Sequence, residues 1–89
     1  MKKILIIDNS AVVRNVIKNI FTDNQRIIIF ESSSKEETEQ LIKENKFFIV
    51  ISNLFLNDSS DSEILKLLEK NSIPTIIFSS TLESNFLNN

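Results

Sequence analysis

Short, fully apolar runs alternate along this chain with longer stretches whose apolar residues recur at helical spacing. The runs cover residues 4–7, 27–30, 47–51 and 76–78. Within each run apolar residues follow one another without polar alternation, which is typical of strands covered on both faces of a sheet. The pattern therefore predicts four parallel strands.

Helical periodicity fills the segments between these strands. Two stripes recur every three to four positions: Val12, Val13, Val16, Ile17, Ile20 and Phe21, and then Ile64, Leu65, Leu67 and Leu68. The middle segment, residues 35–45, has only Leu41 and Ile42 as strong apolar positions. Its helix is supported instead by the capping box of residues 34–37, and similar S-x-x-E boxes stand at 60–63 and 80–83. We expect two of these three boxes to start helices.

The alternation gives the order βαβαβαβ, followed by the opening turns of a fourth helix. It predicts one α/β domain over residues 1–89, a three-layer doubly wound parallel sheet. In such sheets the chemistry lies beyond the carboxyl ends of the strands. Those positions carry Asp8, Glu31, Asn53 and Ser79, which are therefore the candidate site residues.

The residue types missing from the sequence exclude most catalytic machinery. The chain of 89 residues has no His, Cys or Gly. Common zinc sites, Ser-His and Cys-His nucleophiles, P-loops and Rossmann loops therefore cannot form in their usual way. A phosphate-binding enzyme would depend on Asp8, Ser52 and Ser79 alone, so we expect no enzymatic activity and keep this as a remote alternative.

Charge and hydropathy limit the partners. The net charge is −2 and the Lys and Arg residues are spread along the sequence, whereas nucleic-acid binding needs clustered basic residues. The apolar runs are far shorter than the roughly 20 residues of a membrane span or the core of a signal peptide. The expectation is a cytoplasmic protein that contacts neither nucleic acid nor membrane.

Several segments resemble response-regulator receiver domains of the CheY-like type. Residues 2–10, KKILIIDNS, are similar to the family's first strand, which ends in an acidic pair followed by a small polar residue. Residues 31–37, ESSSKEE, stand where the family has E-A-x-x-G-x-E, and residues 50–61 lie over its D-x-x-[LM]-P-x-x-x-G loop. Ser79 matches the family's switch Thr or Ser. The resemblance implies a flavodoxin/CheY-like fold with sheet order 2-1-3-4.

The family's phosphorylation chemistry is not matched. Asn53 stands at the phosphoacceptor position and Asn9 replaces the second residue of the acidic pair. An amide is too weak a nucleophile to attack phosphorus. Asp8 and the Phe55 carbonyl are the only remaining ligand candidates for Mg²⁺, so we expect weak or absent metal binding and no cofactor. The family's loop Pro and Gly are Asn57 and Asp61 here, which predicts a remodelled loop.

Simpler interpretations of the same residues stay open. Asp8 could accept hydrogen bonds from loop amides, and Asn9 with Ser10 could cap the helix that starts near Ala11. Ser79 is either a switch-like residue or a polar residue at a strand end. Asp58 and Asp61 are either substitute carboxylates near the pocket or acidic residues favoured at a helix start.

By the resemblance, the family's Lys belongs to a fifth strand that these 89 residues do not include. The leading hypothesis is a pseudo-receiver of two-component phosphorelay signalling that acts as a phosphorylation-independent protein-interaction module. We expect a homodimer through the edge strand Thr75–Phe78 or through the C-terminal segment. The alternative is a fragment of a longer response regulator, with a second receiver or a diguanylate cyclase downstream, in which this domain is structural or dimerising.

Overall fold

A computed structural model describes residues 1–21, 24–53, 56 and 61–78 of the chain. Its helices and strands follow one another in the predicted alternation. They are β1 (Lys2–Ile7), α1 (Ala11–Ile20), β2 (Ile27–Ser32), α2 (Lys35–Glu44), β3 (Ile49–Asn53), α3 (Asp61–Lys70) and β4 (Thr75–Phe78). In the described part of the chain, no helix is long and apolar enough to cross a membrane.

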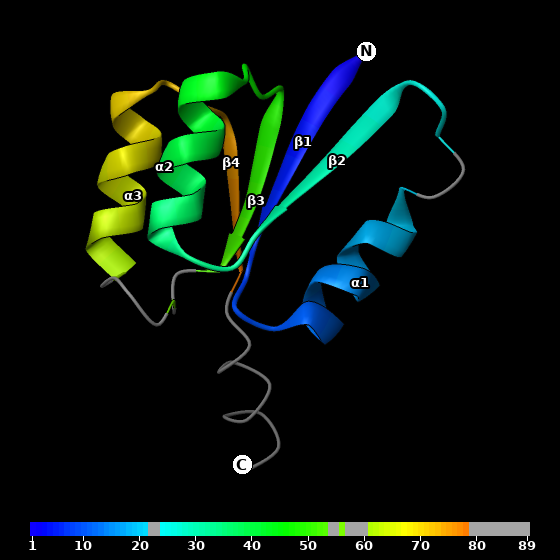
Figure 1. The fold of residues 1–89 in the computed structure, drawn as a ribbon, viewed down its shortest axis with the longest axis horizontal. Helices are drawn as coiled ribbons and strands as arrows, with labels where there is room; N and C mark the ends of the chain where they lie inside the picture. Colours follow the sequence, from blue (N-terminus) through cyan, green and yellow to red (C-terminus); the bar gives the residue numbers. More distant parts are fainter. Residues whose placement is uncertain (22–23, 54–55, 57–60, 79–89) are drawn as a thin grey trace, which may run out of the picture.

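The strands form one parallel sheet in the order β2-β1-β3-β4. Helices α2 and α3 cover one face of the sheet, and α1 lies on the opposite face (Figure 1). This arrangement confirms the predicted three-layer, doubly wound α/β fold. It also places β1 in the interior of the sheet, where Leu5, Ile6 and Ile7 have no exposed surface.

The main core lies between the sheet and the α2–α3 layer. Leu5, Ile7 and Val50 of the sheet pack with Ile64 and Leu68 of α3, together with Phe47 and Leu56. The rings of Phe30 and Phe47 meet edge to face, with centroids 5.4 Å apart. Full burial of such a side chain stabilises a fold by about 1.5–3 kcal/mol, so this layer carries most of the apolar stabilisation.

The opposite face is covered less completely. Val13 and Ile17 of α1 are half-buried, but Val12, Val16 and Ile20 are 72%, 62% and 74% exposed. The predicted six-residue stripe is therefore only partly buried. Four strands about 4.8 Å apart span more than the roughly 10 Å width of one helix, and α1 is the one helix described on this face. In the described part of the chain, apolar side chains on this side of the sheet therefore remain exposed.

The starts of α1 and α2 are capped by serine hydroxyls. Ser10 Oγ accepts from the Val13 amide at 3.3 Å, and Ser34 Oγ accepts from the Glu37 amide at 3.1 Å. The Glu37 carboxylate accepts from the amide of Ser33, one residue before the N-cap, while the Ser34 amide donates to Ser32 Oγ. The predicted helix start at residues 34–37 is thus confirmed, although its carboxylate binds the amide one residue earlier than a capping box requires. The boxes at 60–63 and 80–83 include residues outside the described ranges, although α3 does begin at Asp61.

Candidate functional site

The candidate site lies where the carboxyl ends of β1 and β3 come together. Asp8 directly follows β1, and Asn53 is the last residue of β3. Because the two strands are parallel and pair from Ile4–Ile49 through Ile7–Ser52, the residues that come next in each strand meet at the same edge. Asp8 and Asn53 are only 1% and 2% exposed, so they form a buried polar pair.

A hydrogen bond joins the two side chains. Asn53 Nδ2 donates to Asp8 Oδ2 at 2.9 Å. The opposite orientation of the amide would place its carbonyl oxygen against a carboxylate oxygen, and two acceptors cannot hydrogen-bond. The contact with Asp8 therefore identifies which side-chain atom of Asn53 is the nitrogen. The other carboxylate oxygen, Asp8 Oδ1, accepts from the Ser10 amide at 2.7 Å. Both Asp8 oxygens are therefore engaged within the chain, as the simpler interpretation of this residue predicted.

The backbone of Asp8 is held equally firmly. Its amide donates to the Ser32 carbonyl of β2 at 3.0 Å. Its carbonyl accepts from Arg14 Nη1 of α1 at 2.7 Å. These contacts tie the end of β1 to the neighbouring strand and to the following helix, so the Asp8 side chain is fixed in direction.

An ion-pair network at the end of β2 was not found by sequence reasoning. The Glu31 carboxylate receives Arg14 Nε and Lys18 Nζ of α1, each at 3.0 Å. The hydrogen bond from Lys18, followed by that from Arg14, lowers the pKa of Glu31 below its ordinary value. A signal was present in the sequence: Arg14 and Lys18 are four residues apart, so they share one helix face. Glu31 alone gave no indication of which charges it would meet.

Serine and threonine hydroxyls near the site are satisfied within the fold. Ser52 Oγ donates to the Asn53 carbonyl at 3.0 Å. Ser32 and Thr38 form a buried hydroxyl pair at 2.8 Å, and Thr38 Oγ1 also donates to the Ser34 carbonyl. The Ser52 hydroxyl thus fixes the end of β3 and has no adjacent base to activate it among the described residues.

The structure brings together some of the predicted site residues and leaves others undescribed. Asp8 and Asn53 are in direct contact. Ser10 caps α1, as the sequence indicated, whereas Asn9 is exposed to solvent. Phe55, Asn57, Asp58 and Ser79, together with the Asp61 side chain, lie outside what the structure describes. Among the described residues, no group of three His, Cys, Asp or Glu side chains could hold a metal ion.

Comparison with known proteins places this geometry in a recognised fold. No protein-family model matches the sequence, and no curated protein matches it significantly. A solved structure, the MaeR response regulator bound to beryllium trifluoride, superposes with a TM-score of 0.81 at 21% sequence identity. The superposition covers 99% of this chain and 75% of that one. The chain therefore has the fold of a CheY-like receiver domain.

Proposed function

We propose that this chain is a degenerate receiver of a two-component-type signalling protein. In this proposal it regulates a protein partner in the cytoplasm by binding and accepts no phosphate. The supporting observation is the buried hydrogen bond from Asn53 Nδ2 to Asp8 Oδ2 at 2.9 Å. Receivers attack a phosphodonor with an Asp carboxylate, and here the corresponding side chain is an amide that donates to its neighbour.

Chemistry at Asn53 supports a binding role over a catalytic one. An amide nitrogen is too weakly nucleophilic to attack phosphorus. The Asn53 amide is also held against a carboxylate, and its backbone carbonyl accepts from Ser52. No described residue at the ends of β1 and β3 supplies a nucleophile with a base beside it. We therefore assign the chain no enzymatic activity.

The donor set at this edge does not fit Mg²⁺. The ion needs near-octahedral oxygen ligands at about 2.0–2.1 Å and usually more than one anionic ligand. Asp8 is the single carboxylate of the pair, and both its oxygens accept hydrogen bonds. The Asn53 amide N–H also directs its partial positive charge at the Asp8 carboxylate, where a cation would otherwise bind. We propose that the hydrogen bond stands in for the metal, so no cofactor is required.

Mass spectrometry tests the proposal directly. The purified chain is incubated with Mg²⁺ and acetyl phosphate, or with beryllium fluoride, and its intact mass and binding are measured. The MaeR response regulator, which binds beryllium trifluoride, is the positive control. We expect no change in the mass of this chain and no bound fluoroberyllate. A stable gain of one phosphoryl group mapped to the segment around Asn53 would overturn the proposal.

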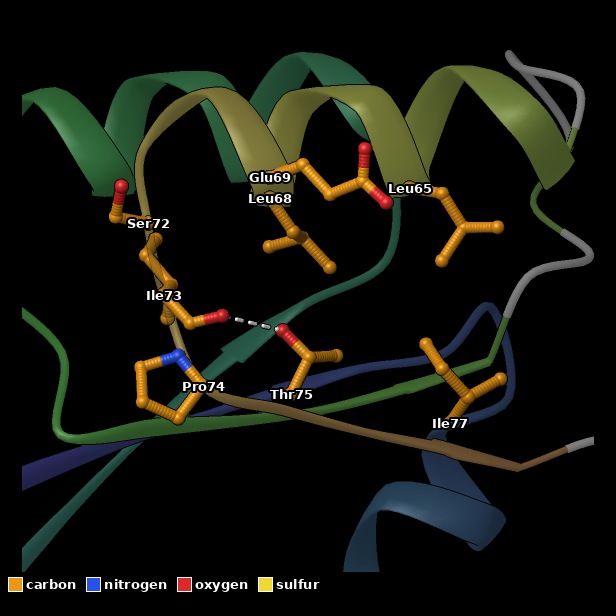
Figure 2. A pocket seen from close by; sticks show the side chains of 8 residues that line it. All are labelled: Leu65, Leu68, Glu69, Ser72, Ile73, Pro74, Thr75 and Ile77. Atoms are coloured by element: carbon orange, nitrogen blue, oxygen red, sulfur yellow. Dashed lines mark hydrogen bonds between the residues drawn. The ribbon is translucent and has the colours of Figure 1, made fainter.

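A homodimer through β4 is the proposed mode of self-association. β4 is one of the two outer strands of the described sheet, the other being β2, and its Ile76 and Ile77 side chains are 52% and 40% exposed. A hollow of about 440 Å³ opens beside it, into which Ile77 and Leu65 of α3 point (Figure 2). An apolar outer strand is a template for pairing with another chain. The C-terminal segment, the other expected contact, lies outside the described residues.

The alternative proposal places these residues at the front of a longer response regulator. A further strand or output domain would then occupy the β4 edge, and this domain would be structural or dimerising. Sequencing of the gene beyond codon 89 distinguishes the two. Neither proposal involves a membrane or nucleic acid.

A further inference from the structure

The fold creates a groove between α2 and α3 on the outer surface of the main layer. The two helices lie side by side on one face of the sheet (Figure 1) and are joined by Lys35 and Glu63, whose charged atoms are 3.8 Å apart. One hollow of about 270 Å³ is lined by Glu39, Ile42, Lys43, Leu67, Lys70 and Asn71. A second shares Glu39, Leu67 and Lys70 with it and extends to Lys35, Glu63 and Lys66. Together they form what we call the α2–α3 groove.

Charge is distributed unequally along this groove. Its two carboxylates, Glu39 and Glu63, both contact Lys35, at 3.0 and 3.8 Å. The other three lysines, Lys43, Lys66 and Lys70, are exposed and form no ion pair within the described part of the chain. Four lysines and two glutamates give the groove a net charge of +2, although the chain as a whole carries −2. Lysines far apart in the sequence are thus gathered by the fold.

The groove also has apolar parts. Ile42 of α2 and Leu67 of α3 line it and are half-buried. The aliphatic stems of the lysines extend this apolar surface, since such side chains pack along their methylene groups while keeping the charge in water. Each helix has ten residues, so the groove is about 15 Å long, the length of roughly ten residues of helix.

We propose that the α2–α3 groove is the docking site for an acidic segment of a protein partner. The segment would be a short helix that places apolar side chains on Ile42 and Leu67 and carboxylates beside Lys43, Lys66 and Lys70. The inference rests on the proposed function, because it names the partner surface of the binding module. The apolar floor and the small number of unpaired lysines favour a protein segment over nucleic acid, which binds through many phosphate contacts.

Fluorescence anisotropy with the full 89-residue chain tests this inference. The probe is a labelled helical peptide of about 14 residues, roughly four turns, with Leu on one face and Glu flanking it. Its control has Gln in place of every Glu. Exposed ion pairs each contribute a factor of about 1.4 to 5 in affinity. Three pairs at the lower end of the measured range, a factor of about 1.4 each, combine to about threefold, so the triple variant Lys43→Gln, Lys66→Gln, Lys70→Gln should bind the probe at least about threefold more weakly.

Arg26→Gln provides the matched control, because Arg26 is exposed, lies before β2 and does not line the groove. This variant should bind the probe as tightly as the unmodified chain, and the Gln peptide should bind weakly to all of them. Three results would overturn the inference: the probe does not bind, the triple variant binds it with unchanged affinity, or Arg26→Gln loses as much affinity as the triple variant. Tighter binding of single-stranded DNA of equal charge would overturn the choice of partner. None of these results depends on phosphoryl uptake at Asn53, so the proposed function is tested separately.

Discussion

At the residue scale, the main feature of the candidate site is the buried contact between Asn53 and Asp8. A buried hydrogen bond to a charged group contributes about 1.5–3 kcal/mol to stability. Two carboxylates at the same separation of about 3 Å would instead repel by about 5.5 kcal/mol at an effective dielectric of 20. A pocket with paired carboxylates therefore needs a cation to be stable when ionised, whereas the amide of Asn53 stabilises Asp8 without one.

Replacement of Asn53 should make stability depend on metal. We expect Asn53→Asp to lower the free energy of unfolding at pH 7 by about 2 kcal/mol or more, because a charge-assisted hydrogen bond becomes a repulsion. In the double variant Asn53→Asp, Asn9→Asp, added Mg²⁺ should recover much of this loss, since several carboxylates can then share the ion. Urea unfolding with and without Mg²⁺ measures both effects.

Asn53→Ala is the control for this substitution, because it removes the hydrogen bond without adding charge. It should be destabilised but should not respond to Mg²⁺.

At the element scale, Glu31 is the link between β2 and α1. It binds Arg14 and Lys18, and these contacts lower its pKa from the ordinary value of 4.5. A carboxylate with a lowered folded-state pKa stabilises the fold above its unfolded pKa and loses that effect as pH falls through the folded value. The attachment of α1 should therefore weaken in acid.

Glu31→Gln tests this dependence. We expect the variant to be less stable at pH 7 by about 1 kcal/mol, since these half-buried pairs are still partly screened by solvent. The difference from the unmodified chain should begin to shrink below about pH 4.5 and vanish once Glu31 is protonated. Thermal unfolding between pH 3 and 7 measures it, with Glu69→Gln on exposed α3 surface as the control. A difference that stays constant across this range would contradict the linkage.

The elements themselves could be predicted because each depends on local pattern. Continuous apolar runs located all four strands, periodicity located α1 and α3, and the capping box at residues 34–37 located α2. The start of the third strand was predicted too early. Residues 47 and 48 are apolar and continue the run, but β3 begins at Ile49 and the Phe47 side chain packs in the core from outside the strand. Partial burial of the α1 stripe also escaped prediction, because periodicity identifies an apolar face but not what covers it.

The site could be predicted in its location but not in its bonding. Strand-end positions identified Asp8 and Asn53 as neighbours, since parallel strands end at a common edge. The direct hydrogen bond between them depends on side-chain directions that only the packed sheet fixes. The contact of Arg14 with the Asp8 carbonyl and with Glu31 was missed for the same reason, because it joins a helix to two different strands.

At the scale of the whole molecule, the two faces of the sheet are stabilised unequally. The α2–α3 layer encloses the main hydrophobic cluster, while Val12, Val16 and Ile20 of α1 and Ile76 of β4 remain exposed. Ile76 pairs with Ile51, which pairs with Ile6, so these three residues lie in one row across the sheet. Burial falls along this row from Ile6, which is fully buried, to Ile76 at the outer strand. Within this row of the sheet, apolar side chains thus become more exposed toward β4.

This distribution leads to the prediction that the 89-residue chain forms a two-fold dimer through β4. Light scattering at micromolar concentration should give twice the mass of one chain. Ile76→Lys should yield a monomer, because a charged side chain on an outer strand disfavours pairing. Its cost to the fold should be small, since Ile76 is already 52% exposed. Val16→Lys, at a 62% exposed position of α1, is the matched control and should remain dimeric. A monomer whose β4 amides are protected from hydrogen exchange would contradict the prediction, because the edge would then be closed within one chain.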